Sequence, residues 1–274
     1  MTAVELNFIE EGDGPLVVLL HGFPEFSYSW RHQLPALARA GFRAVAPDMR
    51  GYGQSPKPRD VDAYRMTEIV DDIRALIERL GGAPCILVGH DWGAFAAWYF
   101  AMSHPELLRK LVILNVPHPA PLSRELRRSF RQKLKLTYQL VFRIPKLPEL
   151  LMRILGKPMM RRLGRFTRDD VATYARAWRD SSTPMFNYYR AVPRARRDLR
   201  RLIRPIDIPT MLIWAEHEPV FLRATTENFR EWVPNLRFEL IQGAGHFVQT
   251  DAAERVTKLL VDFLKNANEE KGRA

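Results

Sequence analysis

Short apolar runs alternate with amphipathic stretches along the chain, a pattern typical of buried strands that alternate with helices. Residues 16–20, 42–46 and 85–88 are apolar runs that end at glycine, proline or polar residues, as strands of a parallel sheet do. From 66 to 80 the apolar residues recur at helical spacing, and two glycines follow where a helix would stop. The chain therefore begins as an α/β unit.

The same alternation continues, and resumes once more near the end of the chain. A helix is predicted over 92–103, strands over 111–114, 211–214 and 238–241, and a closing helix over 253–264. We predict an α/β fold with a mostly parallel central sheet flanked by helices.

The stretch between these two α/β parts has a different character. It lacks the alternation typical of strands, and prolines punctuate both its entry and its exit. We predict a helical cap over residues 118–206, inserted into a core made of residues 1–117 and 207–274.

The composition fits one folded protein of this kind. The chain has 274 residues, of which 46% are hydrophobic, enough for a large core. No run approaches the ~20 apolar residues of a bilayer span, and residues 4–7 lack the basic and then apolar layout of a secretory signal. The single cysteine, Cys85, excludes an internal disulfide and lies in a predicted strand. We expect a cytoplasmic protein with a buried thiol.

The net charge of +11 comes from the predicted cap. Residues 118–204 hold 23 Lys and Arg against 6 Asp and Glu, about +17, while the other residues sum to about −6. From 124 to 135, basic and apolar residues interleave as on a helix that docks on anionic lipid or nucleic acid. The plainer interpretation is a solvated surface. We expect no nucleic-acid partner and no stable membrane insertion.

Residues 88–94 read Val-Gly-His-Asp-Trp-Gly-Ala and join a predicted strand to a predicted helix. Small residues flank a reactive one in this way at a nucleophile elbow, where the backbone turns too sharply for a Cβ. The reactive position holds Asp91. A carboxylate there can attack an sp3 carbon and form an alkyl ester, which indicates epoxide opening or carbon–halogen cleavage. Taken alone, Asp91 could also be the N-cap of the following helix.

Candidate partners for Asp91 lie at the ends of other strands. The loop after 16–20 would present the backbone N–H of Phe23 beside that of Trp92, and these two donors can hold a developing negative charge. His246 lies in a glycine-rich loop after a late strand. With an ordinary pKa of ~6.5, it can take a proton from water at neutral pH.

The carboxylate that orients this histidine is expected in the loop after strand 211–214. That loop holds Glu216 and Glu218. The chain order is then nucleophile, acid, histidine, as in an α/β hydrolase. The spacing of the other histidines is not that of a metal site, so we predict neither a metal nor a cofactor.

These residues resemble a known family, the epoxide hydrolases of the α/β-hydrolase fold, which are close to the haloalkane and haloacetate dehalogenases. The resemblance covers nearly the whole chain and implies a core with an inserted helical cap. It also favours Glu218 over Glu216 as the acid of the catalytic triad. The motifs are H-G-F-P-E at 21–25, D-M-R-G-Y-G-Q-S at 48–55, V-G-H-D-W-G at 88–93, N-V-P-H-P at 115–119 and G-A-G-H-F at 243–247.

The resemblance implies that two cap tyrosines, Tyr138 and Tyr189, donate hydrogen bonds to the epoxide oxygen. A phenol, with a pKa of ~10, stays protonated at neutral pH and can donate to the alkoxide that forms as the ring opens. On a helix Tyr188 and Tyr189 point ~100° apart, and the resemblance selects Tyr189. The alternative is that these tyrosines only pack the cap onto the core. The residues expected to contact substrate are Phe23, Trp92, Phe142 and Phe247.

A dehalogenase would use the same nucleophile. Haloalkane dehalogenases share a tryptophan at position 92 but usually have Asn where this chain has Phe23. Haloacetate dehalogenases have Arg where this chain has Trp92 and Phe95, because guanidinium groups clamp the substrate carboxylate. Both differences favour epoxide hydrolysis. A third possibility is a non-catalytic scaffold that binds polyanions or anionic membrane through the basic cap.

We therefore predict a hydrolase that acts on ether bonds and converts small, mainly apolar epoxides to vicinal diols, a detoxifying reaction. Asp91 forms a covalent ester with the substrate, and His246 is the general base that activates water. The protein is expected to be a monomer or a homodimer.

Overall fold

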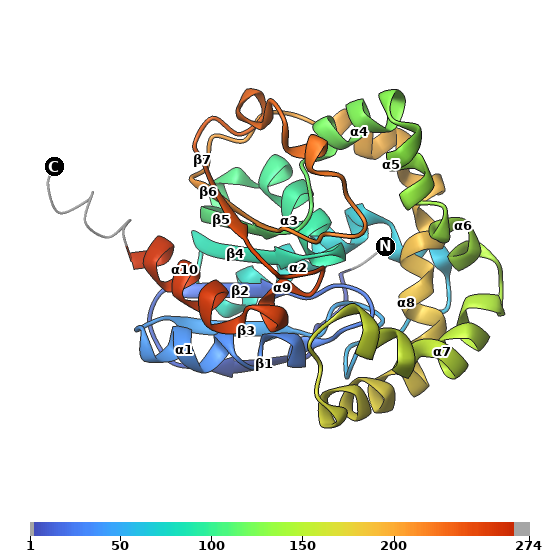
Figure 1. The fold of residues 1–274 in the computed structure, drawn as a ribbon. Coiled ribbons are helices and arrows are strands. Elements are labelled where there is room, and N and C mark those ends of the chain that lie inside the picture. The colour runs from blue at the N-terminus through green and yellow to red at the C-terminus, as the bar shows by residue number, and fades with distance from the viewer. Residues whose placement is uncertain (1–2, 266–274) are drawn as a thin grey trace, which may run out of the picture.

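The structure is a computed structural model that describes residues 3–265. In this part of the chain a seven-stranded sheet runs through the centre, in the order β1-β3-β2-β4-β5-β6-β7 (Figure 1). Neighbouring strands are parallel except β1 and β3, which pair antiparallel. The strands are β1 (Phe8–Glu11), β2 (Leu16–Leu20), β3 (Arg43–Pro47), β4 (Cys85–His90), β5 (Leu108–Leu114), β6 (Thr210–Ala215) and β7 (Leu236–Ile241).

Helices cover both faces of the sheet. One face is covered by α1 (Gln33–Arg39), the short α9 (Val248–Asp251) and α10 (Ala253–Lys265), and the other by α2 (Met66–Leu80) and α3 (Trp92–Ser103). The inner strands are thus buried on both faces, which explains why they are largely apolar, whereas the edge strands β1 and β7 are partly exposed. Short 3-10 helices lie in the loops, at Ser27–Trp30, Val61–Tyr64, Pro105–Leu107, Arg223–Thr226 and Phe229–Glu231.

Side chains along each strand alternate between two cores. In β2, Val17 and Leu19 belong to the core beneath α1 and α10, whereas Leu16, Val18 and Leu20 belong to the core beneath α2 and α3. This alternation fixes the register of each strand in the sheet, because a shift of one residue would exchange the two sets.

Five helices lie between β5 and β6, and we call residues 119–202 the helical segment. In Figure 1 they form the right-hand side of the molecule, with α8 packed against α2, α3, α6 and α7. The segment falls within the predicted cap, whose domain limits at 118 and 206 stay a prediction. The helices are α4 (Pro119–Arg128), α5 (Phe130–Lys135), α6 (Tyr138–Arg143), α7 (Leu147–Leu163) and α8 (Arg168–Leu202).

Helix α8 is fastened to the loops that follow β2 and β3. The indole N–H of Trp178 donates to the Pro24 carbonyl at 2.6 Å, and the Tyr188 hydroxyl donates to the Arg50 carbonyl at 2.8 Å. All parallel strands of the sheet end on this side, so α8 covers the edge where loop residues converge.

The predicted α/β class with a mostly parallel sheet is confirmed. The helices over 66–80 and 92–103 have the predicted bounds, and most strands differ from the predicted ones by one to three residues. Cys85 is buried in β4, as expected, and burial raises its pKa to about 12. Of the helices within residues 3–265, none has both the length and the apolar composition needed to cross a bilayer.

In the core, three elements were not predicted: β1, α1 and the four-residue helix α9. Strand β1 is an edge strand that exposes three of its four residues, so its sequence shows no apolar run. Helix α1 has seven residues, too few for a helical period to be recognised.

Candidate active site

Asp91 stands at a sharp turn between β4 and α3. Its φ of 48° and ψ of −117° are unusual for a residue with a Cβ. The glycines around it leave room for this turn: a Cβ on Gly93 would lie 2.4 Å from the Leu20 carbonyl oxygen, and one on Gly89 would lie 2.5 Å from the Gly93 carbonyl oxygen. A Cβ on Gly22 would lie 2.3 Å from the Asp91 Cβ. The geometry is that of the predicted nucleophile elbow.

The two oxygens of the Asp91 carboxylate face different partners. Oδ1 accepts a hydrogen bond from the backbone N–H of Phe23 at 2.7 Å. Oδ2 lies 3.6 Å from Nε2 of His246. Trp92 is the first residue of α3, so its amide is one of the N–H groups at the start of the helix that no helical carbonyl accepts. The Asp91 carboxylate therefore points toward the loops that carry Phe23 and His246, and not along α3.

Glu218, and not Glu216, meets the histidine. Oε2 of Glu218 lies 2.8 Å from Nδ1 of His246, and its Oε1 accepts from the Val220 amide at 2.7 Å. Glu216 is nearly half exposed and accepts from the Gly243 amide at 2.9 Å. Glu218 therefore bonds one ring nitrogen of His246 while the other faces Asp91.

The charges of this buried set shift each other's pKa values. Burial alone would raise the pKa of Asp91. Its hydrogen bond and charge interaction with His246, together with the nearby His90, lower that pKa below the usual value. Burial alone would lower the pKa of His246, but the charges and hydrogen bonds of Glu218 and Asp91 raise it well above 6.5. Both shifts favour the charged forms of Asp91 and His246.

A second layer of polar residues fixes the loop that carries His246. The side-chain amide of Asn115 donates to the His246 carbonyl at 2.7 Å, and Nε2 of His90 lies 2.8 Å from the same oxygen. Nδ1 of His90 in turn lies 3.2 Å from Glu25, which also accepts from Gln249 at 2.9 Å.

Sequence reasoning had not assigned roles to these supporting residues. His90, Glu25 and Asn115 stand inside the motifs noted above, at 88–93, 21–25 and 115–119. Their presence in those motifs was the only signal that could have identified them.

The predicted tyrosines lie together above Asp91. The rings of Tyr138 and Tyr189 are 6.3 Å apart, and that of Tyr189 is 5.0 Å from Trp92. Burial, with the charge of Asp91, raises the pKa of both tyrosines above the usual value, so both are protonated donors. Tyr188 points elsewhere, toward the Arg50 carbonyl, as the helical geometry required.

The four aromatic residues expected to contact substrate do not form one cluster. Phe23 and Phe142 pack against each other and against Tyr189, with ring centres 5.0 to 5.4 Å apart. Trp92 packs against Tyr189 and also lines a cavity. Phe247 is 2% exposed and packs against Phe166, His90 and His246, beneath the base rather than beside the tyrosines.

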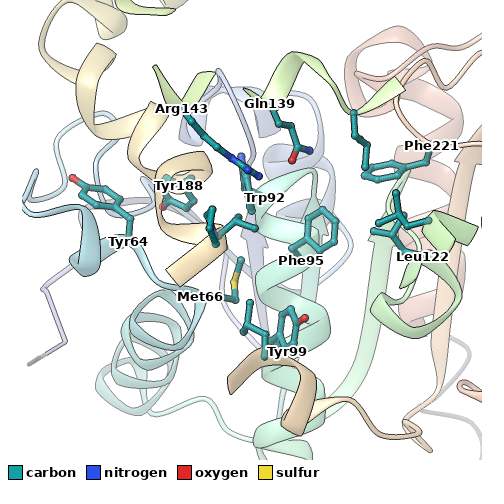
Figure 2. A pocket seen from close by; sticks show the side chains of 15 residues that line it. Tyr64, Met66, Trp92, Phe95, Tyr99, Leu122, Gln139, Arg143, Tyr188 and Phe221 are labelled. Atoms are coloured by element: carbon teal, nitrogen blue, oxygen red, sulfur yellow. The ribbon is translucent and has the colours of Figure 1, made fainter. Parts of the chain in front are cut away.

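A cavity of about 460 Å³ opens beside Trp92, between α3 and the helical segment. Figure 2 shows Phe95 and Tyr99 of α3 on one side of it and Gln139 and Arg143 of α6 on another. Most of its wall is apolar. The lining residues are Tyr64, Met66, Trp92, Phe95, Tyr99, Leu122, Leu126, Leu136, Gln139, Arg143, Tyr188, Val192, Pro193, Leu199 and Phe221.

Histidine, cysteine and acidic side chains do not gather elsewhere in a way that suggests a metal site. Over residues 3–265, no group of three or more such residues has the arrangement that a metal ion needs. Of the remaining histidines, His118 is fully buried, and burial lowers its pKa to about 4, whereas His32 and His217 are exposed.

Comparison with known proteins places the chain among related hydrolases. The family model described as the alpha/beta hydrolase fold matches residues 15–253. The chain is 36% identical to the AB hydrolase superfamily protein YfhM of Bacillus subtilis, over 93% of this chain and 91% of that protein. It is 32% identical to Epoxide hydrolase 3 of Xenopus tropicalis, over 96% of this chain and 76% of that protein.

Solved structures give the same result. An inhibitor complex of an epoxide hydrolase from Bacillus megaterium superposes with a TM-score of 0.87 at 35% identity, covering 96% of this chain and 97% of the other. An epoxide hydrolase from Vigna radiata superposes with a TM-score of 0.83 at 30% identity, covering 96% of this chain and 98% of the other. The predicted fold family is confirmed.

Proposed function

Because the chain belongs to the epoxide hydrolases of the α/β-hydrolase fold, we propose that it opens small, mainly apolar epoxides to vicinal diols through an ester on Asp91. The observation that carries this proposal is the position of one carboxylate between an amide donor, a histidine and two protonated tyrosines. The apolar cavity beside Trp92 supports an apolar substrate.

In the first step, Asp91 Oδ2 attacks a ring carbon of the epoxide. The new carbon–oxygen bond forms as the ring carbon–oxygen bond breaks, and the ring oxygen leaves as an alkoxide. Tyr138 and Tyr189 donate hydrogen bonds to this oxygen, since both phenols are protonated. The low pKa of Asp91 keeps the nucleophile ionised.

Protons balance across this step. The resting site contains one imidazolium and two carboxylates. Loss of one proton from His246 to the alkoxide gives an alcohol, a neutral ester and a neutral imidazole, at the same total charge. Esterification also removes the Asp91 charge that helped to raise the pKa of His246. Formation of the ester therefore converts His246 from an acid into the base that the next step requires.

In the second step, His246 takes a proton from water as the water oxygen attacks the ester carbonyl. Glu218 stabilises the imidazolium that results. The amides of Phe23 and Trp92 hold the charge that develops on Oδ1. Collapse of this intermediate releases the diol and leaves one oxygen from water in Asp91.

Within this proposal residues 118–206 form the cap of the active site, and substrate contacts Phe23, Trp92 and Phe142. Phe247 supports His246 from beneath. A dehalogenase is disfavoured because Phe23 and Phe95 occupy places where that chemistry needs polar side chains to bind halide or carboxylate.

Single-turnover labelling tests the covalent step. With excess enzyme in heavy-oxygen water, the label is expected in the peptide that contains Asp91, and the first diol should carry none. Asp91→Asn should lower diol formation by at least about a thousandfold, because an amide is a poor nucleophile. Haloalkanes and haloacetate serve as control substrates. Label that enters the first diol directly would contradict the ester mechanism.

A further inference from the structure

One surface of the helical segment is both apolar and basic. Of the twelve large hydrophobic residues that stand exposed in the described part of the chain, ten lie between 130 and 163. Residues 124–165 hold 13 Lys or Arg and 2 Glu, a net +11, which equals the charge of the whole chain. The ten exposed hydrophobic residues are Phe130, Leu134, Leu140, Val141, Ile144, Leu147, Leu150, Ile154, Leu155 and Leu163.

Helix α7 carries the clearest part of this surface. Its buried residues, Pro148, Met152, Gly156 and Met160, follow at intervals of four and face α8. Exposed Leu147, Leu150 and Ile154 are spaced by three and four residues, which puts them on the opposite side of the helix. We call these three residues the outer stripe. A helix that packs by one face alone does not need such a stripe, because its outer face would normally be polar.

Cations run alongside the outer stripe. Arg153, Lys157 and Arg161 follow at intervals of four and are exposed. Arg153 and Lys157 also line a groove of about 880 Å³ between α7 and α8, together with Arg176 and Arg179.

Glu149 is the one acidic residue of the groove lining. It lies 2.8 Å from Arg190, so it neutralises little of the charge that Arg153 and Lys157 present.

We propose that this surface docks on an anionic lipid bilayer, with phosphate headgroups at the cations of the α7–α8 groove and the outer stripe in the acyl region beneath them. Leucine and isoleucine next to a row of cations are typical of helices that lie in a membrane interface. A nucleic acid would satisfy the charge but not the apolar side chains. A second copy of the chain would bring two strongly positive faces together.

Docking would also place the cavity near its substrates. Helix α6 lines the cavity through Gln139 and Arg143, and it exposes Leu140 and Val141, with Ile144 exposed just past its end. Apolar epoxides concentrate in bilayers, because transfer of apolar surface out of water is favourable. Docking does not depend on epoxide chemistry, so its failure would leave the proposed function intact.

Co-sedimentation of the full chain with vesicles tests the proposal. We expect binding to vesicles of phosphatidylcholine mixed with phosphatidylglycerol, weakened by salt, and little binding to phosphatidylcholine alone. Arg153→Gln with Lys157→Gln should weaken binding about thirtyfold, if each cation contributes about 1 kcal/mol at the surface. Leu150→Ser with Ile154→Ser should weaken it at least about tenfold, through lost apolar burial.

The matched control removes two exposed cations from the core helix α10, Arg255→Gln with Lys258→Gln, and should bind vesicles like the unmodified chain. Each variant should hydrolyse a water-soluble epoxide normally without vesicles, which shows that it is folded. Three results would overturn the proposal: equal binding to both lipid compositions, equal loss in the control, or unchanged binding by the serine variant. Sedimentation of the chain without vesicles would point instead to self-association and would also overturn it.

Discussion

The core and the helical segment both contribute to the site, but they hold their residues in different ways. Asp91, His246 and Glu218 follow three strands of one sheet and are fixed by backbone amides and buried hydrogen bonds. Tyr138 and Tyr189 sit on helices and are held by ring packing. The core carries a net negative charge and the segment a strongly positive one. In the proposed mechanism, bond making and breaking therefore takes place on residues that the core holds by hydrogen bonds.

This division implies that the core residues carry out both chemical steps, whereas the segment residues assist only the first. Substitutions in the two regions and a pH series can break or sharpen this view.

The largest effect is expected from His246→Gln. Asp91 can still attack the epoxide, with solvent supplying the alkoxide's proton in place of His246, but no base remains to activate water, so diol formation should fall about a thousandfold. The ester should accumulate, and mass spectrometry of quenched protein should show one added substrate per chain. Absence of an adduct would mean that His246 is also needed for ring opening.

In the unmodified enzyme, lowering the pH should stop ester hydrolysis while ring opening continues. Ring opening needs ionised Asp91, whose pKa lies below its usual value, and so it persists in acid. Hydrolysis needs neutral His246, whose pKa is raised by the charges of Glu218 and Asp91, and in the ester Glu218 still raises it. As pH falls, hydrolysis is therefore lost first. The fraction of enzyme present as ester should rise, as measured by rapid quench across a pH series.

A smaller loss, on the order of a hundredfold, is expected from Glu218→Gln, because the neutral amide no longer stabilises the imidazolium. Glu216→Gln is the matched control, and its activity should be nearly unchanged because Glu216 bonds the Gly243 amide. Steady-state hydrolysis of one epoxide compares the two variants. Equal losses would contradict the assignment.

The sequence predicted the core part of the site better than the segment part, for a physical reason. Asp91 requires Gly89 and Gly93 as neighbours, because a Cβ on either would overlap the backbone, and such a requirement leaves a local pattern. The choice between Glu216 and Glu218 left no local pattern, since both stand in one loop and only folding decides which reaches His246.

The choice of tyrosine, by contrast, could not be made from the local sequence. Nothing local distinguishes Tyr189 from Tyr188, because both are buried aromatics on one helix, and the resemblance had to select between them. Strand β1 could not be predicted either, because an edge strand buries little and so has no apolar run. The cavity could not be predicted at all, since its lining converges from α2, α3, α4, α6, α8 and several loops.

An intermediate effect is expected when the segment's donors are removed. Tyr189→Phe and Tyr138→Phe should each lower the rate of ring opening about ten- to hundredfold, the value of a hydrogen bond to a charged oxygen. The rate of ester hydrolysis should change little. Tyr188→Phe is the matched control: it loses the bond to the Arg50 carbonyl, so stability falls while ring opening persists. If Tyr138→Phe and Tyr189→Phe slowed ester hydrolysis as much as ring opening, the division between the two regions would be wrong.

The smallest effect on chemistry is expected where the two regions touch. The Tyr174 hydroxyl of α8 donates to Glu25 at 3.1 Å, and Glu25 contacts His90 beneath the base. Tyr174→Phe leaves a buried carboxylate oxygen without this donor, so the free energy of unfolding should fall by about 1–3 kcal/mol. Ester hydrolysis should persist, because Asn115 still fixes the His246 carbonyl.

The comparison variant for this contact is Tyr28→Phe, which removes a hydrogen bond to Asp170 at the same interface. Asp170 keeps its contact with Arg31 and its bonds within α8, so this variant should lose less stability. Thermal melting gives the stability of both variants, and rapid quench gives their hydrolysis rates. If Tyr174→Phe slowed hydrolysis without lowering the melting temperature, the helical segment would be setting the position of the base, and the core could no longer be regarded as self-sufficient in the second step.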